Sequence, residues 1–389
     1  MTKTAIVAGG GIAGTVAAIA LHRAGFTPLV HEALPADTDD RGAFLTVAVN
    51  GLAALRSLGL DPAQVLAAGY PTPRLALSNG AGRRLADLPL GGPTADGTVT
   101  TTIKRADLYA ALRAAATRDG IEIRYGKRLV TLTERADRVT ARFADRTSVT
   151  GHLLVGADGL HSRTRRLVDP AAPEPRYLGL LNAGGFTTRP VSADLDRTPG
   201  LMHMAFGRRC FFGWSPAPDG SVWWFANPPS KRPHGGFAPD AWRAHLIDLV
   251  AGDSGPAAAI IRATDDVLGP WNTFDLPRVP VWRTARAVLI GDAAHAVAPS
   301  SGQGASMAIE DAVTLGRCLT GADVPAALAD YESRRRARVE KVVAFGHRSS
   351  SGKTAGPVGA WIRDRTTPLV MRLLYRNGDP QAWIFDHRV

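Results

Sequence analysis

Three glycines near the start of the chain have the spacing of a dinucleotide-binding turn. Gly9, Gly11 and Gly14 form Gly-x-Gly-x-x-Gly, with Ala13 inside the motif. In such a turn the first glycine permits a tight bend, the second lets a pyrophosphate approach the backbone, and the third lets a helix pack closely on a strand. The N-terminus of that helix then offers unpaired N–H groups to the phosphates. A glycine-rich turn without a ligand is the alternative.

The flanking segments supply the elements that this motif requires. Thr4–Ala8 is short and β-rich, Ile12–Ala24 is an alanine-rich helical segment, and Pro28–Ala33 predicts a second strand. Glu32 lies near the end of that second strand, where its carboxylate can accept hydrogen bonds from an adenosine ribose. The sequence therefore predicts dinucleotide binding, and this motif alone does not distinguish FAD from NAD.

Two further segments predict a strand, a polar loop and a helix. Leu153–Val168 reads LLVGADGLHSRTRRLV, in which an apolar strand leads to an Asp-Gly pair at Asp158 and a short basic helix. Val288–Leu319 reads VLIGDAAHAVAPSSGQGASMAIEDAVTLGRCL, in which a strand ends near Asp292 and a Pro/Ser/Gly loop leads to a helix from about Gly304.

The three motifs, in this order from residue 2 to about 345, resemble the single-component FAD-dependent aromatic hydroxylases, the family typified by para-hydroxybenzoate hydroxylase. The resemblance implies non-covalent FAD, NADH or NADPH as a transient co-substrate, and O2. It implies insertion of one oxygen atom into an aromatic small molecule through a C4a-hydroperoxide of the flavin. The absence of a second strand–GxGxxG–helix unit argues against enzymes with a separate NAD(P) domain.

The third segment contains the residues expected at the flavin ring. Asp292, at the carboxyl end of a strand, can hydrogen-bond the ribityl hydroxyls. The loop Pro299–Gly304 leads into a helix whose positive N-terminus can face the N1–C2=O edge of the flavin, and Gly302 and Gly304 keep side chains away. For His295 we expect packing or capping of the loop rather than acid–base catalysis.

The resemblance also implies roles for residues outside these loops. Thr102–Leu112, TIKRADLYAAL, is similar to the family's Arg-x-x-Leu-x-x-x-Leu helix start, so Arg105 should reach the FAD pyrophosphate or ribityl chain. Asp158 is implied in flavin and nicotinamide binding, or it braces its own loop. Arg41 occupies a stretch that contacts flavin or admits nicotinamide, and we rank it below Arg105. Arg163 is either a cation for NAD(P)H phosphates or a solvated helix-start residue.

The predicted fold is α/β, with a Rossmann-like FAD-binding domain (βαβ with GxGxxG), an inserted, mostly antiparallel β-sheet substrate domain, and C-terminal helices. The expected FAD-binding domain is discontinuous and comprises residues 1–72, 99–170 and 284–323. The expected substrate domain comprises residues 73–98 and 171–283. A helical segment, residues 324–389, ends the chain.

A predicted hairpin supplies the candidates for a substrate pocket. Cys210–Asn227, CFFGWSPAPDGSVWWFAN, has Pro-Asp-Gly at its turn. Period-2 alternation places Phe212 and Trp214 on one face of the first strand and Trp224 on one face of the return strand. Which face meets the substrate is open, because these side chains can instead pack on the helical segment Trp242–Val250.

The inserted segments predict the substrate class. They contain many aromatic residues and few charges, so we expect a largely apolar, planar, polycyclic or phenolic compound from specialised metabolism. Arg208-Arg209 is the one obvious cationic pair for a carboxylated ring. No His or Tyr stands out as a base for a phenol.

Composition excludes several other classes. The 389 residues are 45% hydrophobic and include only two cysteines, which argues against wholesale disorder, a disulfide framework and a cysteine-based zinc site, and no metal is expected. The net charge of +11 is dispersed, without a basic tail, so no nucleic-acid partner is expected. The glycine run argues against a signal peptide at the N-terminus. For the apolar stripe of Val358–Tyr375 we favour core packing over a membrane contact. The expected location of the protein is cytoplasmic. The oligomeric state is left open.

Alternatives on the same scaffold are an epoxidase, a Baeyer–Villiger oxygenase and a non-catalytic flavin-binding protein. A flavin-dependent halogenase is disfavoured, because no lysine lies between Lys3 and Lys104 and no Trp-x-Trp-x-Ile-Pro element is present.

Overall fold

A parallel sheet lies at the centre of the half that carries the glycine motif. The computed structural model describes residues 3–36, 42–192, 194–234, 236–351, 353 and 356–389. The strand order is β18-β12-β1-β2-β8, and every neighbouring pair is parallel. The bounds are β1 Lys3–Ala8, β2 Phe26–His31, β8 Ile123–Arg124, β12 Leu153–Gly156 and β18 Ala287–Leu289. The run Ala5–Ala8 of β1 is fully buried, because both faces of the sheet are covered.

Helices cover one face of this sheet, and a three-stranded antiparallel sheet covers the other. On the helical side lie α1 Ile12–Arg23, α2 Val49–Ser57, α3 Pro62–Val65, α4 Arg105–Arg118 and α9 Gly304–Leu319. On the other side lie β9 Leu129–Glu134, β10 Val139–Phe143 and β11 Ser148–Gly151. Because β1, β12 and β18 are parallel, their carboxyl ends share one edge of the sheet, and the loops that follow them lie together there.

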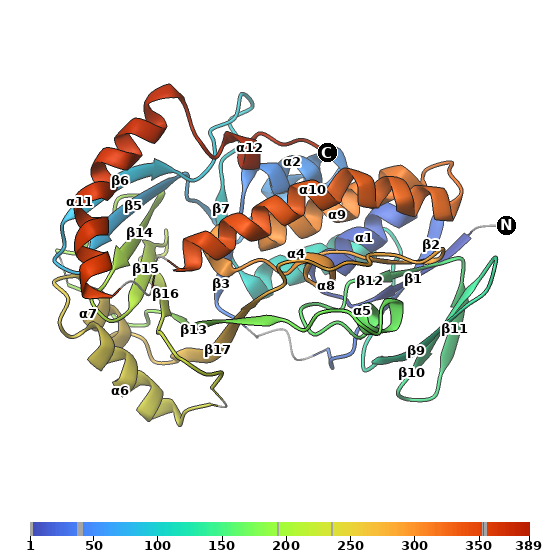
Figure 1. Ribbon diagram of the computed structural model, residues 1–389, viewed down its shortest axis with the longest axis horizontal. Coiled ribbons are helices and arrows are strands. Elements are labelled where there is room, and N and C mark those ends of the chain that lie inside the picture. The colour runs from blue at the N-terminus through green and yellow to red at the C-terminus, as the bar shows by residue number, and fades with distance from the viewer. Residues whose placement is uncertain (1–2, 37–41, 193, 235, 352, 354–355) are drawn as a thin grey trace.

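A seven-stranded sheet forms the other half, on the left of Figure 1. Its order is β17-β13-β16-β15-β14-β5-β6, and all neighbouring pairs are antiparallel except β14 and β5. The bounds are β5 Arg74–Asn79, β6 Arg84–Pro89, β13 Arg176–Phe186, β14 Leu201–Phe206, β15 Phe211–Pro216, β16 Val222–Asn227 and β17 Leu268–Asp275. Two helices cover one of its faces, α6 Pro239–Val250 and α7 Ala257–Arg262. The predicted α/β fold class, with a Rossmann-like region and a mostly antiparallel sheet, is confirmed.

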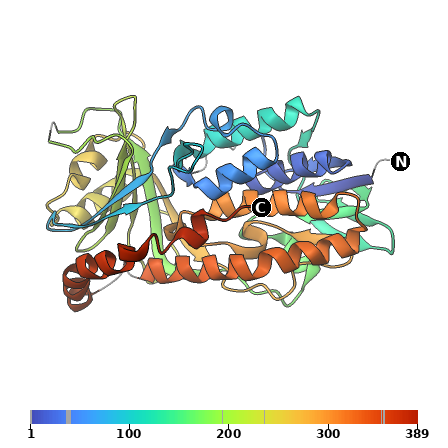
Figure 2. The same ribbon diagram turned by 90° about the horizontal axis from the view of Figure 1, so that it is seen from above.

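A small sheet and the C-terminal helices join the two halves. The small sheet has the order β3-β7-β4, with β3 Phe44–Val47, β7 Thr101–Lys104 and β4 Tyr70–Pro71. Helix α10, Val324–Ser351, packs along α9 and runs from the first half to the second (Figures 1 and 2). Short helices complete the chain: α5 Arg163–Val168, α8 Asp292–His295, η1 Pro299–Ser301, η3 Tyr375–Asn377 and α12 Ala382–Phe385.

Helix α11, Pro357–Leu374, lies at the outer edge of the seven-stranded sheet (Figure 1). Core packing was expected for its apolar stripe, but most of its large apolar side chains are exposed. Over the described ranges, no helix combines the length and the apolarity that crossing a bilayer requires.

Candidate functional site

The glycine turn between β1 and α1 is packed so closely that side chains have no room. A Cβ on Gly9 would lie 2.3 Å from the carbonyl oxygen of Ala157, and one on Gly14 would lie 1.9 Å from the carbonyl oxygen of Gly9. Gly9 also has a φ of 108°, which glycine adopts readily. Gly11 is the N-cap of α1 and provides no side-chain cap, so the first N–H groups of α1 are available to an anion.

Glu32 follows β2 directly and braces this turn. Its Oε2 accepts a hydrogen bond from the Gly10 N–H at 2.7 Å, and its Oε1 accepts one from the Leu34 N–H at 2.8 Å. A carboxylate has about four acceptor positions, so two backbone contacts leave capacity for the hydroxyls of a ribose. Glu32 is therefore positioned both to hold the loop and to bind a ligand.

Arg105 is the first residue of α4 and faces the glycine turn. Its Nε and Nη2 donate to the hydroxyl of Tyr109 at 3.0 and 2.7 Å, and a Cβ on Gly11 would lie 3.6 Å from the same hydroxyl. Asp292 lies close enough for its charge to act on Arg105, but within the described part of the chain Arg105 forms no ion pair. A guanidinium without an acid partner beside an open helix N-terminus is suited to a phosphate.

The loop after β18 places Asp292 at the same edge of the sheet. Gly291 has a φ of 57°, and a Cβ there would lie 3.0 Å from the Cβ of Ala13 and 3.4 Å from that of Ala308. Ala13 thus packs the glycine motif against the third motif. The side chain of Asp292 is exposed, and no described residue forms a hydrogen bond or ion pair with its carboxylate, so its oxygens can bind hydroxyl groups.

A buried charge cluster holds this loop from behind. Asp311 accepts hydrogen bonds from the Gly291 N–H at 2.9 Å and from Arg335 Nε at 2.7 Å, and it contacts His295 Nε2. Burial alone would raise the pKa of Asp311, but the charges of His295 and Arg335 outweigh it and lower the pKa to about 2. Glu310 accepts from Arg335 Nη1 at 2.6 Å. His295 is only 3% exposed and acts within this cluster, which agrees with packing rather than a role at an open site.

Sequence reasoning did not identify this cluster. The signal was present as two adjacent acids, Glu310 and Asp311, inside an otherwise apolar helical segment, MAIEDAVTL. Buried acids of this kind require cationic partners, and the only run of three arginines, which contains Arg335, lies in the following helix.

The loop that contains Pro299, Gly302 and Gly304 is fixed by contacts with α2 and β3. Ser306 Oγ accepts a hydrogen bond from the N–H of Ala48 at 3.0 Å. Asn50 Nδ2 donates to Gln303 Oε1 at 3.0 Å and to Glu310 Oε1 at 2.7 Å. Gly302 has a φ of 61°, so a side chain there would be strained. The three predicted loop residues therefore belong to a loop that is held against α2 and β3.

The side chains of Asp158 and Arg163 are bound to groups other than those of the glycine turn. The carboxylate of Asp158 accepts from the Thr164 N–H at 2.8 Å, from the Thr164 hydroxyl at 2.9 Å and from the Ser162 hydroxyl. These contacts brace the start of α5, and a role in cofactor binding stays a prediction. Arg163 donates to the carbonyl oxygen of Val130 at 3.1 Å. Arg41 lies outside the described residues.

The hairpin β15–β16 presents its two faces to different neighbours. Phe212, Trp214 and Trp224 are buried against α6 and α7, and the Trp224 indole donates to the Thr264 hydroxyl at 2.9 Å. Packing with these helices, the alternative stated for these residues, is what the structure shows. The opposite face carries Trp223 and Phe225, and it is this face that meets the half with the glycine turn.

Aromatic side chains from both halves meet on that opposite face. The ring of Phe44, in β3, lies 5.7 Å from Trp223, 6.2 Å from Phe225 and 6.3 Å from Phe186, measured between centroids. Lys104 Nζ lies 4.9 Å from the centroid of Phe186. We call Phe44, Phe186, Trp223 and Phe225 the aromatic face.

Lys353 was also missed by the sequence reasoning. Its Nζ donates to Asn227 Oδ1 at 2.6 Å and lies 4.2 Å from the centroid of Phe211, and no described acid forms an ion pair with it. Burial lowers its pKa to about 7, and Cys210 acts weakly in the opposite direction. Asn227 and Phe225 are two positions apart in β16, so they lie on the same face of that strand. Lys353, which is hydrogen-bonded to Asn227, is therefore a polar group at the end of the aromatic face.

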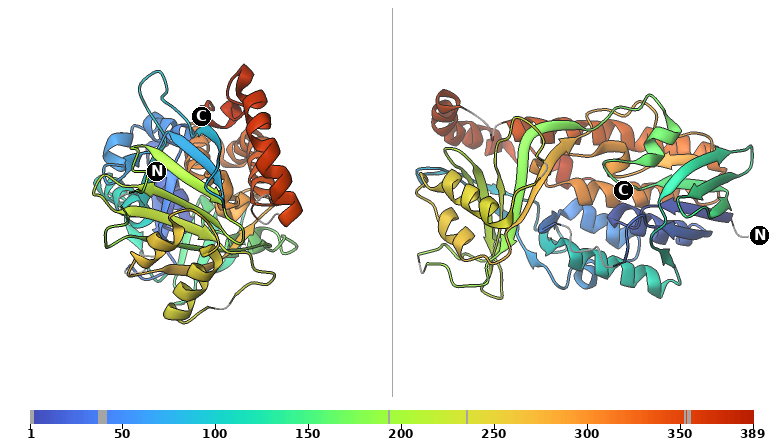
Figure 3. Two further views of the ribbon diagram at one scale, coloured as in Figure 1. Left: turned by 90° about the vertical axis from the view of Figure 1, so that its left-hand side faces the viewer. Right: turned by 90° about the horizontal axis from the view of Figure 1, so that it is seen from below.

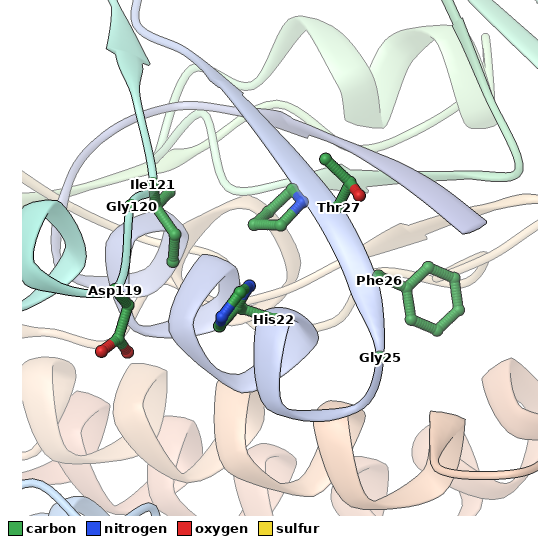
Figure 4. Close-up of a pocket in the computed structure, with 8 residues that line it drawn as sticks. His22, Gly25, Phe26, Thr27, Asp119, Gly120 and Ile121 are labelled. Carbon is green, nitrogen blue, oxygen red and sulfur yellow. The ribbon is translucent and has the colours of Figure 1, made fainter. Parts of the chain in front are cut away.

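One hollow in the surface lies elsewhere. A pocket of about 300 Å³ is lined by His22, Phe26, Asp119 and Ile121 (Figure 4). It lies at the start of β2, the end of the parallel sheet opposite to the glycine turn, and so is not part of the candidate site.

Comparisons with known proteins agree with this arrangement. A family model described as an FAD binding domain matches residues 1–198 and 273–346. The aurachin C monooxygenase/isomerase of Stigmatella aurantiaca is 34% identical over 368 residues, 93% of each chain. The FAD-dependent urate hydroxylase of Klebsiella pneumoniae is 31% identical over 92% of this chain and 94% of its own. The crystal structure of Klebsiella pneumoniae HpxO complexed with FAD and uric acid is similar, with a TM-score of 0.81 and 29% identity, over 94% of this chain and 93% of that chain.

Proposed function

This chain belongs to the single-component FAD-dependent aromatic hydroxylases, and we propose that it uses NADH or NADPH and O2 to insert one oxygen atom into a planar, largely apolar aromatic or polycyclic compound of specialised metabolism. Its FAD is held without a covalent bond. The relative named for urate supports a ring substrate, and the aromatic face supports a planar and apolar one.

The residues at the edge of the parallel sheet fit FAD. A Cβ on Gly11 would meet only the Tyr109 hydroxyl, at 3.6 Å, so the N-terminus of α1 is open to a ligand, and Arg105 has a guanidinium without a described acid partner. In this proposal the N-terminus of α1 and Arg105 hold the phosphates, Glu32 holds the adenosine ribose and Asp292 holds the ribityl hydroxyls. The loop Pro299–Gly304 and the start of α9 then lie at the ring system.

One observation carries the proposal: the cofactor residues and the aromatic face meet at the junction of β7 and α4. Arg105 faces the glycine turn, and the preceding residue, Lys104, lies over Phe186 and over Trp223, with its Nζ 5.5 Å from the Trp223 centroid. Phe44 belongs to the aromatic face, and Ala48, just after the same strand, is hydrogen-bonded to the loop at Ser306. A ring bound on this face would thus lie beside the cofactor.

The chain contributes positioning and proton control to the reaction. When bound, FAD supplies the redox chemistry, the uptake of electrons from NAD(P)H and the activation of O2. The aromatic face orients the substrate by stacking and excludes water from it. The Lys353 amine can donate a hydrogen bond to a phenolic or carbonyl oxygen, and with a pKa of about 7 it can hold or release a proton near neutral pH. Asn227 fixes its position.

The test is oxygen incorporation by the purified holoprotein. Oxidation of NADH and of NADPH is followed with a panel that includes urate, 6-hydroxynicotinate, indoles and quinolines, and products are analysed by mass under ¹⁸O2. We expect one apolar bicyclic class to stimulate oxidation and to gain one labelled oxygen atom. Retention of FAD without labelled product from any ring compound would refute the monooxygenase proposal.

A pair of variants on one hairpin tests the location of the substrate. Phe225→Leu should raise KM for the stimulating compound, because Phe225 belongs to the aromatic face. Phe212→Leu is the matched control and should change stability but not KM, because Phe212 packs under α6 and α7. The reverse result would place the substrate elsewhere.

A further inference from the structure

Exposed apolar side chains are concentrated on one helix. Of the nine large hydrophobic side chains that are exposed in the described residues, seven belong to α11. Those on α11 are Val358, Trp361, Ile362, Leu369, Val370, Leu373 and Leu374. Val358 is 73% exposed, Leu369 61% and Leu373 56%. Isolated exposed hydrophobic residues are common, but a contiguous group of this kind marks an interaction surface.

The helical repeat places the centre of this group on the outer side of α11. Val358, Ile362, Leu369 and Leu373 follow spacings of four, seven and four residues, which lie on one face of a 3.6-residue helix. We call these four residues the outer face. In both views of Figure 3, α11 lies at the periphery of the molecule.

The opposite side of α11 attaches it to the seven-stranded sheet. Met371 packs into the apolar cluster of β5, β6 and β14. Arg363 lies 4.3 Å from the centroid of Phe206, and Asp364 accepts a hydrogen bond from Asn79 Nδ2 at 2.7 Å. The helix is therefore anchored by its inner side, and its outer face is not needed to hold it.

Among the residues of α11, cations flank the outer face and acids do not. Arg365 and Arg372 are exposed, and the Arg365 guanidinium lies 4.3 Å from the centroid of Trp361. The one acid within α11, Asp364, is directed inward, where it pairs with Asn79 and Arg363. An apolar face bordered by arginine and an aromatic residue is the pattern of a helix that lies in a membrane interface.

We propose that α11 docks this protein on the surface of an anionic lipid membrane, with its outer face at the boundary of headgroups and acyl chains. A second copy of the chain is a poorer occupant of this face. A two-fold contact brings the same residues together, so Arg365 and Arg372 would face their own copies with no acid of α11 to neutralise them. Anionic headgroups supply that neutralisation, and acyl chains cover the apolar side chains.

Docking would also bring the proposed substrate site close to lipid. The cluster that receives Met371 also contains Phe225 and Phe44 of the aromatic face. An apolar ring compound dissolved in the membrane would then be near its site. This consequence rests on the proposed function, whereas the docking itself does not.

The experiment is cosedimentation of the full-length holoprotein with phosphatidylcholine vesicles, with and without phosphatidylserine. We expect binding only with phosphatidylserine, and weaker binding at high salt. The double variant Arg365→Gln with Arg372→Gln should reduce the vesicle partition coefficient by about 30-fold, because the attraction of two cations to the anionic surface is lost. Leu369→Ser with Leu373→Ser should reduce it by at least about 10-fold.

The control is Val130→Ser with Val281→Ser, which removes the two large hydrophobic side chains outside α11 that are exposed in the described part of the chain, and it should leave vesicle binding unchanged. FAD content and the thermal transition show that each variant is folded. No binding to either vesicle, or binding that survives both α11 double variants, would overturn the proposal. A concentration-dependent dimer that is abolished by Leu369→Ser with Leu373→Ser would assign the outer face to a second copy of the chain instead. None of these readouts requires turnover, so they are independent of the monooxygenase test.

Discussion

Replacing Asp311 by asparagine should destabilise the protein far more than removing an exposed ion pair. One carboxylate oxygen of Asp311 accepts from the Gly291 N–H and contacts His295, and the other accepts from Arg335 Nε. An asparagine keeps one acceptor oxygen and turns an N–H₂ group toward one of these donors. Arg335 is 1% exposed, so it would keep a buried charge with only Glu310 to balance it.

The expected cost in the free energy of unfolding is about 3–5 kcal/mol, the range for breaking a buried charge pair. The matched control is Asp330→Asn, in which an exposed pair with Arg334 is lost. Those side chains are 45% and 64% exposed, and solvent screening makes the cost of losing this pair small. Urea unfolding of the flavin-free proteins at pH 7 measures both values.

The same substitution should alter acid stability and flavin retention. The pKa of Asp311 is lowered to about 2. Its ionised carboxylate therefore contributes fully to the free energy of unfolding above pH ~4, and this contribution is lost as the pH falls towards 2. Asp311→Asn should remove that part of the acid transition. FAD affinity should also fall, because the loop that carries Gly291 and Asp292 is no longer held by the Asp311 carboxylate. An unfolding free energy within about 1 kcal/mol of the Asp330→Asn value would refute this reasoning, because an uncompensated buried charge must cost more.

Gly14→Ala should abolish FAD binding in a fluorescence titration, because the new Cβ would lie 1.9 Å from the carbonyl oxygen of Gly9. The control variant Gly255→Ala should bind FAD normally, because a Cβ there meets nothing within 4 Å. Arg105→Ala should weaken FAD binding by about 1–3 kcal/mol, the value of a charge-assisted contact, and equal affinity in this variant and in Arg163→Ala would contradict a phosphate role. Because burial lowers the pKa of Lys353 to about 7 from 10.5, the unfolded state binds more protons between these pH values, so the free energy of unfolding should rise with pH there. Lys353→Met should flatten that rise in urea unfolding, and an identical slope in both proteins would show that the amine is not buried.

Local spacing was sufficient to predict the cofactor half. The glycine turn, the strand before it, the helix after it and Glu32 lie within one βαβ unit, where chain geometry alone sets their relative positions. The same holds for the hairpin β15–β16, because a Pro-Asp-Gly turn between two apolar runs determines the pairing. The resemblance to the hydroxylase family implied that Asp292 and Gly304 lie at the same site as the glycine turn. The parallel strands of the structure, whose carboxyl ends share one edge, explain that placement.

Contacts between distant segments were decided only by the tertiary structure. Alternation along the hairpin divided its aromatics into two sets, but α6 and α7 determined that Phe212, Trp214 and Trp224 pack in the core and that Trp223 and Phe225 face the FAD-binding half. The alternation by itself did not settle this choice, because both faces carry large aromatic side chains.

Which charged residues pair inside the protein was also decided by the tertiary structure, for a related reason. Asp311 and Arg335 are in different helices, and Lys353 meets Asn227 across 126 positions of the chain. From the sequence alone, a charged residue predicts a solvated side chain. Only the packing of distant segments shows which oppositely charged or polar group lies beside it. In α11 the reverse holds: a helical apolar stripe predicts a buried side, but the sheet took the other side of the helix, and the stripe was left exposed. Periodicity defines the faces of an element, and only the packing of the whole chain determines which face is covered.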